Sequence, residues 1–317
     1  MKELNINMTD LTQLPGVGAG IAEKLNEGGI ITIMGVATST PGQIGDASGI
    51  TPKAARKIIQ AARDMLKLGF ENAEDVEKIQ RETRYIPTEC ETIDTLLGGG
   101  LKLGTTMEAF GQFSSGKTNL SHLFAVSSIK QFPESYVIWI DTENTFSAKR
   151  IRQFCKGLGV DPEHVISHIK IGKAVTSDHQ ILLTENVEKE IVDGKLDVKL
   201  IVVDSLMNHF RAEYLGRGTL AGRQQMINSY LHKIAALVSN YNLAVYMTNQ
   251  VQHDPGQMFG NPEKAVGGNI VGHFCTIRLW LGKAAKGTRR MRLVDSPDLP
   301  EGEALFKINE TNLESVE

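Results

Sequence analysis

Residues 111–118 read Gly-Gln-Phe-Ser-Ser-Gly-Lys-Thr and combine residue types that can bind a polyphosphate. They fit the phosphate-loop pattern of a glycine, any four residues and then Gly-Lys-Thr. Gly111 and Gly116 permit a tight turn in which backbone N–H groups approach an anion, and Lys117 can reach the terminal phosphates. The Thr118 hydroxyl suits Mg²⁺, so we predict a site for a nucleoside triphosphate with Mg²⁺. The residues predicted to bind it are Gly111, Gln112, Phe113, Ser114, Ser115, Gly116, Lys117, Thr118 and Asn119.

Three apolar runs end in polar residues that could hydrolyse such a ligand. Hydrolysis requires a metal ion, a positioned water and compensation of the charge on the γ-phosphoryl group. Asp204 follows four aliphatic residues and is predicted to hold Mg²⁺, while Glu143 is predicted to orient or deprotonate the attacking water. Gln250 could sense the γ-phosphate, and with Lys117 and Glu143 it completes the predicted catalytic set. The alternatives are a helix N-cap for Asp204 and a structural ion pair for Glu143. The three runs are 136–140, 200–203 and 244–247.

Residues 85–317 predict an α/β domain that would bring these side chains together. Apolar runs alternate with helical segments beyond Tyr85, which is typical of a mainly parallel sheet, and a final strand is expected at 304–308. The phosphate loop lies between an apolar run, 106–110, and a helical run, 118–129. Because the carboxyl ends of parallel strands meet at one edge of a sheet, we expect the polar residues after each run to surround the phosphate loop.

Residues 1–66 predict a small all-α domain. A turn at 15–18 precedes a helical pattern, and a weaker echo at 48–52 precedes a second helix at 54–66. This pairing resembles a double helix-hairpin-helix domain, whose glycine-rich hairpins offer backbone N–H groups to DNA phosphate without reading bases. The segment carries six Lys and Arg against six Asp and Glu, so no basic surface supports DNA binding. A plain helical spacer is the alternative.

Residues 67–84 form a polar, charged segment that we interpret as a linker with a short helix. It contains Phe70 and, three residues later, Ala73. On the residues alone, such a pair is usually a helix end that packs on its own domain. The chain is therefore divided into a helical domain at 1–66, this linker, and a large domain at 85–317.

The composition is that of an ordinary globular protein and argues against a highly basic, a secreted or a membrane-spanning protein. The 317 residues are 41% hydrophobic and 22% charged, with a net charge of −3, so the chain is no bulk polycation and DNA contact must come from local patches. The three cysteines lack metal-ligand spacing, which favours a reducing cytoplasm. We find no signal peptide and no apolar run long enough to span a bilayer, so no membrane partner is expected.

Two later segments are rich in glycine and polar residues, and we expect both to be long loops. The first, 210–223, carries Arg211, Arg217 and Arg223 six residues apart around glycines, and the second, 251–273, carries five glycines. Long glycine-rich loops inside a compact domain are usually functional or disordered. Arginines on flexible backbone suit the tracking of a phosphate chain. A solvated surface loop is the alternative for each segment.

Taken together, these motifs resemble the archaeal RadA recombinases of the RecA/RadA strand-exchange family. The similarity covers nearly the whole chain and includes 14–18, 210–214 and 295–303. The resemblance implies a RecA-like P-loop ATPase core that follows the helix-hairpin-helix domain in the sequence. It also implies ATP-dependent homologous pairing and strand exchange in recombinational repair. Single-stranded and double-stranded DNA would be the partners, and the protein would be a homo-oligomer, either a helical filament on single-stranded DNA or a ring.

The resemblance also implies roles for individual residues. Phe70 and Ala73 match a polymerisation motif in which the Phe inserts into the core of a neighbouring subunit. Glu143 matches the catalytic glutamate. Gln250 and His273 match the pair that links nucleotide state to DNA binding.

Further residues match positions that contact ATP or DNA in the family. Arg150 and Pro300 match the pair that sandwiches the adenine, and Asp295 matches a cap that reaches ATP across the subunit interface. The segments 210–223 and 251–273 match the first and second DNA-binding loops. The residues implied to bind DNA are Arg211, Arg217, Arg223 and His273.

The chain departs from the family pattern at several positions. Gln112, Ser114 and Asn119 replace Glu, Gly and Gln in the phosphate loop, Asn144 follows the catalytic glutamate, and Asn269 replaces a histidine. From these departures the sequence does not predict whether the turnover rate and the DNA affinity match those of the family. They also motivate one alternative, an accessory paralogue that binds DNA under ATP control without exchanging strands. A hexameric helicase on the same class of core is a second alternative.

Overall fold

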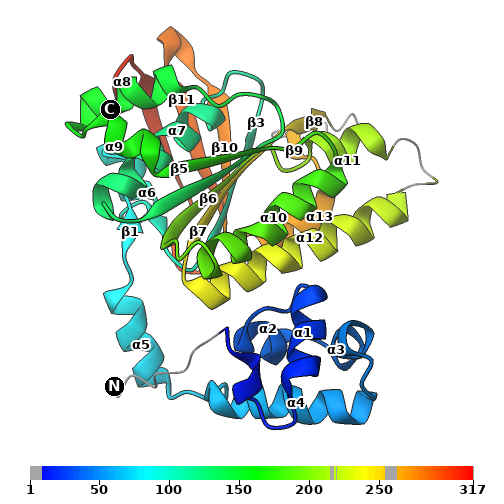
Figure 1. The fold of residues 1–317 in the computed structure, drawn as a ribbon. Helices are drawn as coiled ribbons and strands as arrows, with labels where there is room; N and C mark the ends of the chain where they lie inside the picture. The colour runs from blue at the N-terminus through cyan, green and yellow to red at the C-terminus, as the bar shows by residue number, and fades with distance from the viewer. Residues whose placement is uncertain (1–8, 215–217, 219, 254–262, 317) are drawn as a thin grey trace. The chain divides into compact units, whose positions relative to one another are not determined.

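The computed structural model describes residues 9–214, 218, 220–253 and 263–316. The chain divides into two compact units, residues 1–82 and 83–317, and each is described by itself. Arg217 lies outside the described residues. Figure 1 labels most of the helices and strands by the names used below.

The first unit is built from helices alone in its described part, as predicted for the helix-hairpin-helix segment. In α4, the apolar residues Ala55, Ile58, Ile59 and Ala62 recur at helical spacing, and all four are buried. The Thr40 side chain caps α3 through a reciprocal capping box with Gln43, which defines where that helix begins. The helices of this unit are η1 Leu11–Gln13, α1 Ala19–Glu27, α2 Ile33–Thr38, α3 Pro41–Ser48, α4 Pro52–Met65 and α5 Ala73–Glu82.

The second unit is organised by a nine-stranded sheet of order β13-β12-β11-β10-β3-β7-β6-β4-β5. Strands β10 to β5 in this order pair in parallel, and the three at the other edge pair antiparallel, so the predicted mainly parallel sheet is confirmed. The expectation that the last strand lies at 304–308 was wrong, because a short edge strand follows it. The strands are β1 Tyr85–Ile86, β2 Leu101–Lys102, β3 Thr106–Gly111, β4 Tyr136–Asp141, β5 Ile169–Lys173, β6 Val198–Asp204, β7 Ala244–Asn249, β8 Val251–His253, β9 Glu263–Ala265, β10 Ile277–Lys283, β11 Arg289–Asp295, β12 Gly302–Ile308 and β13 Leu313–Val316.

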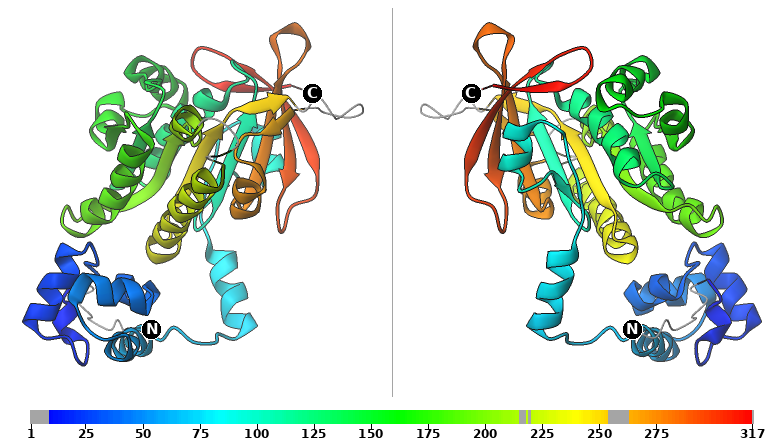
Figure 2. Two further views of the ribbon diagram at one scale, coloured as in Figure 1. Left: turned by 90° about the vertical axis from the view of Figure 1, so that its right-hand side faces the viewer. Right: turned by 90° about the vertical axis from the view of Figure 1, so that its left-hand side faces the viewer.

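Helices cover both faces of this sheet, and Figure 2 shows it between two helical layers. Along β4, Val137 and Trp139 belong to one apolar cluster while Ile138 and Ile140 belong to the other, as the alternation of side chains along a strand requires. None of the helices in the described ranges combines the length and apolarity needed to cross a bilayer. The helices of this unit are α6 Glu91–Leu96, α7 Lys117–Gln131, α8 Ala148–Leu158, α9 Pro162–Ser167, α10 Ser177–Val192, α11 Asn208–Glu213, α12 Leu220–Tyr241, η3 Ala285–Gly287 and α13 Gly268–Phe274.

The two segments expected to be long loops contain regular structure at their described ends. Arg211 lies on α11 and Arg223 on the first turn of α12, and the second segment contains β8, β9 and α13. The loop prediction was therefore wrong for these ends. Burial of Ile227 on α12 and Val271 on α13 explains the difference, because tertiary packing stabilises helices that a glycine-rich composition disfavours.

Candidate nucleotide-binding and catalytic site

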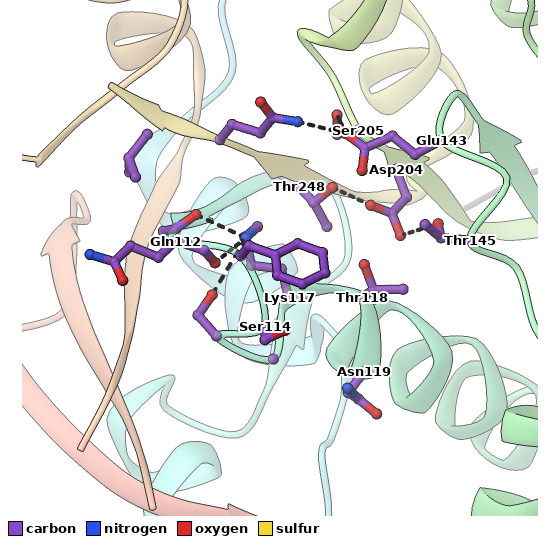
Figure 3. Close-up of a pocket in the computed structure, with 16 residues that line it drawn as sticks. Gln112, Ser114, Lys117, Thr118, Asn119, Glu143, Thr145, Asp204, Ser205 and Thr248 are labelled. Atoms are coloured by element: carbon purple, nitrogen blue, oxygen red, sulfur yellow. Dashed lines mark hydrogen bonds between the residues drawn. The ribbon is translucent and has the colours of Figure 1, made fainter. Parts of the chain in front are cut away.

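A cavity of about 540 Å³ opens where β3, β4, β6 and β7 end, at the edge of the sheet where ligands bind in parallel α/β folds (Figure 3). It brings together the whole predicted phosphate loop with the side chains predicted at the ends of the other three strands. Four further residues, for which the sequence predicted no individual role, also contribute to its wall. The lining residues are Gly111, Gln112, Phe113, Ser114, Ser115, Gly116, Lys117, Thr118, Asn119, Glu143, Thr145, Asp204, Ser205, Thr248, Gln250 and Val251.

The phosphate loop is shaped by close backbone approaches that only glycine allows. A Cβ on Gly111 would lie 2.0 Å from the Leu281 carbonyl oxygen. Gly116 has a φ of 112° and precedes the 15-residue helix α7 without a side-chain cap. The first N–H groups of α7 are therefore open to an anion, and the helix dipole favours negative charge there. This donor set fits a polyphosphate.

Lys117 lies folded over the same loop. Its Nζ donates to the carbonyl oxygens of Gly111 and Gln112, both at 2.9 Å, and lies 3.4 Å from the Ser115 hydroxyl (Figure 3). Burial lowers the pKa of Lys117, while the carboxylates of Asp204 and Glu143 act in the opposite direction. A phosphate oxygen would give this half-buried cation a charged partner that the loop carbonyls do not provide.

Asp204 is buried at the end of β6, and its carboxylate lies between hydroxyl groups (Figure 3). It accepts hydrogen bonds from Thr248 and from Thr145, the latter at 3.1 Å, and the Thr118 hydroxyl also bonds it. Burial raises the pKa of Asp204, and the three hydroxyls lower it in part. Because α11 begins with Met207 as its N-cap, the alternative role of Asp204 as a helix cap is wrong.

The oxygen atoms of Thr118 and Asp204 fit Mg²⁺, a hard cation that binds few protein carboxylates and keeps waters and substrate oxygens as its other ligands. Within the described part of the chain, no cluster of three or more His, Cys, Asp or Glu could hold a metal ion by itself. Thr118 and Asp204 would supply two oxygen ligands, and the phosphates of a bound nucleotide could supply others. Thr248 directly follows the apolar run 244–247 and so was among the polar residues expected at this edge, but the sequence predicted neither its bond to Asp204 nor that of Thr145.

Glu143 reaches the cavity from the loop after β4, and its described side-chain partners are neutral. Its Oε1 accepts hydrogen bonds from the Ser205 hydroxyl at 2.7 Å and from the Gln250 amide at 2.9 Å. The Gln250 Oε1 in turn lies 3.4 Å from a guanidinium nitrogen of Arg211. These contacts connect the proposed water-positioning carboxylate to the end of β7 and to the first predicted DNA-binding segment.

Asp141 and His122 hold the loop that carries Glu143. The Asp141 carboxylate accepts from the backbone N–H groups of Glu143, Thr145 and Phe146 at 3.0–3.2 Å. The His122 Nδ1 lies 2.7 Å from the Thr118 carbonyl oxygen, and its Nε2 accepts from the Ser147 N–H at 2.9 Å. His122 is therefore a neutral bridge between the helix of the phosphate loop and the Glu143 loop.

We expect this bridge to make stability depend on pH. Burial lowers the pKa of His122 to about 4 from 6.5, with Arg150 lowering it and Asp141 raising it. The unfolded chain therefore binds more protons in this range, so stability is full above pH 6.5 and falls as the pH drops towards 4. Lowering the pH from 6.5 to 5 should remove about 1.5 kcal/mol of unfolding free energy through this group.

Urea titration of the wild type and His122→Gln at several pH values would measure this contribution. The variant is expected to lose that part of the pH slope, whereas His232→Gln, at an exposed site on α12, should keep it. Equal slopes for His122→Gln and the wild type would contradict the assignment.

Arg150 lies beside the phosphate loop without lining the cavity. Its Nε donates to the Asn119 Oδ1 at 2.8 Å, and its other nitrogens reach the carbonyl oxygens of Asn309 and Glu310 at 3.0 and 2.6 Å. The guanidinium also lies 3.9 Å from the centre of the Phe154 ring. The predicted adenine-contacting arginine is thus held rigidly next to a predicted nucleotide-binding residue.

The remaining predicted site residues do not line this cavity. Asp295, at the end of β11, and Pro300 are both exposed. Arg211 and His273 are exposed on α11 and α13. Arg223 is half-buried, and its Nε has no hydrogen-bond partner among the described residues.

Comparison with known proteins assigns both parts of the chain. A family model described as Rad51 matches residues 80–316, and one described as a SAM-like helix-hairpin-helix tandem matches residues 8–64. The chain is 43% identical to the DNA repair and recombination protein RadA of Methanoculleus marisnigri, over 96% of this chain and 98% of that protein. It is 40% identical to the protein of the same name from Methanocorpusculum labreanum, over 94% and 96% respectively.

Proposed function

Because the chain belongs to the Rad51 family, we propose that it is a DNA-dependent ATPase and recombinase that pairs homologous DNA and exchanges strands in recombinational repair. The observation that carries this proposal is the convergence of the phosphate loop, Asp204, Glu143 and Gln250 on one cavity. Nearly full-length similarity to proteins named for recombination supports it, and no comparison favours the accessory paralogue or the helicase.

In the proposed reaction, water attacks the γ-phosphorus of ATP and the bond to the β-phosphate oxygen breaks. The backbone N–H groups of the loop and Lys117 bind the phosphates and compensate the charge that develops. Thr118 and Asp204 would hold Mg²⁺, which neutralises phosphate charge when it is bound. Glu143, fixed by Ser205 and Gln250, orients the water and accepts its proton.

Both units are proposed to contact DNA through its backbone. Arg211 on α11 and Arg223 on α12 can compensate phosphate charge along single-stranded or double-stranded DNA. In the first unit, α1 begins at Ala19 without a side-chain cap on Gly18, so its first N–H groups can donate to a phosphate oxygen. His273 is proposed to act with them as part of the second DNA-binding segment.

We propose that the protein assembles into filaments by inserting Phe70 of one copy into the core of the next. The Phe70 side chain is fully exposed to solvent in the single chain. A large apolar side chain in this position is typical of a protein contact site. A cavity of about 360 Å³ between β4, β5 and α10 is the proposed acceptor on the neighbouring copy, with Lys170, Asn186 and Glu190 among its lining residues. Its apolar lining consists of Ile138, Ile140, Ile171, Leu183 and Val187.

Phe70→Ala is expected to dissociate the assembly to monomers, because burying a phenylalanine contributes about 2–3 kcal/mol at each subunit contact. Light scattering across a concentration series would measure the mass. Leu68→Ala is the matched control, since Leu68 is also exposed and lies in the same segment. Filaments of unchanged length in Phe70→Ala would reject the contact.

Strand exchange between homologous DNA molecules, measured together with ATP hydrolysis with and without single-stranded DNA, tests the proposed function. Joint molecules and DNA-stimulated hydrolysis are expected. An ATPase rate that does not change when DNA is added, together with an absence of joint molecules, would exclude the proposed recombinase function. Loading of a partner recombinase without exchange would instead support the accessory role.

The proposed location is the cytoplasm. All three cysteines are buried and unpaired, as is usual for proteins kept in a reducing compartment. Burial raises the pKa of the Cys155 thiol to about 11, which makes it unreactive near neutral pH.

A further inference from the structure

Glu263, the first residue of β9, joins the phosphate loop to the opposite wall of the site. One carboxylate oxygen accepts a hydrogen bond from the Gln112 amide, and the other accepts from the Trp280 indole N–H at 2.9 Å. Gln112 and Glu263 lie 151 residues apart in the sequence. The contact therefore links two segments that only the tertiary structure brings together.

The Trp280 side of this link is rigid. Trp280 lies on β10, an interior strand of the nine-stranded sheet. Its ring occupies the space over Gly282, where a Cβ would lie 2.1 Å from the indole. The sheet thus holds the indole N–H in a position where it points at Glu263. Gln112, by contrast, reaches the Glu263 carboxylate from an exposed loop. Movement at the link is therefore expected on the side of the phosphate loop and β9.

The β8–β9 hairpin contacts the site at both of its ends. Gln250, directly before β8, donates to Glu143, and Glu263, which pairs with His253 of β8, accepts from Gln112. The hairpin and the residue before it thus contact the proposed water-positioning carboxylate at one end and the phosphate loop at the other.

We propose that the Gln112–Glu263 contact transmits phosphate-loop occupancy to the β8–β9 hairpin, with Glu263 as a positioning residue. This inference rests on the proposed function, in which that hairpin belongs to the second DNA-binding segment. The Gln112–Glu263 link operates in addition to the contact between Gln250 and Glu143.

Charge explains why ATP would act on this link. The Glu263 carboxylate is close enough to Lys117 to interact with it electrostatically. A triphosphate bound by Lys117 places several negative charges near Glu263, and like charges at this range repel. Lys117 also donates to the Gln112 carbonyl oxygen, a bond that competes with its binding of phosphate. ATP and the observed Gln112–Glu263 contact therefore favour different positions of β9.

The test compares DNA affinity with and without a saturating, non-hydrolysable ATP analogue, and the ratio of the two dissociation constants is the coupling factor. Wild-type protein is expected to show a factor of about 5–150, the usual range for coupled sites. In Glu263→Ala and in Gln112→Ala the coupling factor should fall about tenfold, or to one where the wild-type factor is itself below ten. The double variant should fall no further than either single one, because both substitutions remove the same contact.

Two further variants separate the link from a loss of fold. Glu263→Gln keeps the size and hydrogen-bonding oxygen but loses the charge, so its factor should lie between those of the wild type and Glu263→Ala. Glu134→Ala, an exposed glutamate in the turn before β4, should match the wild type. Coupling factors in Glu263→Ala and Gln112→Ala within twofold of the wild type would overturn the link alone. A wild-type factor of one would overturn both the link and the nucleotide-controlled DNA binding of the proposed function.

Tryptophan fluorescence gives a second, direct measurement. The chain has two tryptophans, and Trp139 packs on His122 and Phe146 near the loop that carries Glu143. The part of a nucleotide-induced change in emission that Trp280→Phe removes is therefore the part assigned to Trp280. This part is expected in the wild type and should be lost in Glu263→Ala. An identical change in Glu263→Ala would show that Trp280 senses nucleotide without Glu263 and would contradict the proposal.

Discussion

Lys117→Ala is expected to abolish detectable ATP hydrolysis, lowering kcat by at least about 10²–10³-fold, the cost of removing one donor to developing charge. The side chain lies over the loop that receives the phosphates, and its half-buried ammonium is held beside Asp204 and Glu143. Alanine leaves those two carboxylates without a compensating cation, so the bound triphosphate should also be destabilised. Phosphate release at saturating ATP, with and without single-stranded DNA, would measure the loss.

The control for Lys117→Ala is another lysine on the same helix. Lys130 lies in the last turn of α7 and pairs with Glu89 at 2.7 Å, far along the helix from the phosphate loop. Lys130→Ala should keep the wild-type rate, because an exposed ion pair contributes only about 0–1 kcal/mol. A rate in Lys117→Ala within tenfold of the wild type would mean that the loop binds the phosphates through its backbone alone.

Glu143→Gln is expected to lower hydrolysis by about 10²–10⁴-fold while leaving ATP binding intact. Glutamine keeps the length of the side chain and an oxygen that can accept from Ser205 and Gln250, so the loop should retain its shape. It cannot accept the proton of the attacking water. The ATP-bound state should therefore persist, and DNA binding should be retained or prolonged, in contrast to Lys117→Ala.

Nucleotide retention on rapid filtration and DNA dissociation rates would distinguish the two variants. Lys117→Ala is expected to weaken nucleotide binding as well as hydrolysis, whereas Glu143→Gln is expected to lose hydrolysis alone. Comparing the changes in kcat and in KM separates these two cases. Glu163→Gln is a suitable control, since Glu163 is exposed and pairs with Arg152 at 2.6 Å on the surface. Hydrolysis by Glu143→Gln at the wild-type rate would show that another group positions the water.

The sequence by itself determined the parts of this protein that depend on neighbouring residues. A phosphate loop needs a tight turn and a helix N-terminus, and both requirements are met within the eight residues 111–118. Asp204, Glu143 and Gln250 could be predicted because each follows an apolar run, and runs of this kind are typical of parallel strands that end at one edge. The helical first unit was predictable from the apolar spacing on α4.

Only the tertiary structure decided which residues surround these groups. Thr145 and Thr248 bond Asp204 because the sheet places β4 and β7 on either side of β6, an order that no local pattern encodes. His122 is a bridge rather than an ordinary core histidine because α7 packs beside the loop after β4.

The helices α11, α12 and α13 also depend on tertiary structure. Their segments have glycine-rich compositions that favour loops, and burial of residues such as Phe210, Ile227 and Val271 overrides that preference. The Gln112–Glu263 contact joins side chains that only the fold brings together. Hydrogen bonds and packing between residues far apart in the chain depend on strand order and helix placement. Those are properties of the whole fold, which is why the sequence predicted the reactive groups while the structure identified the residues that hold them.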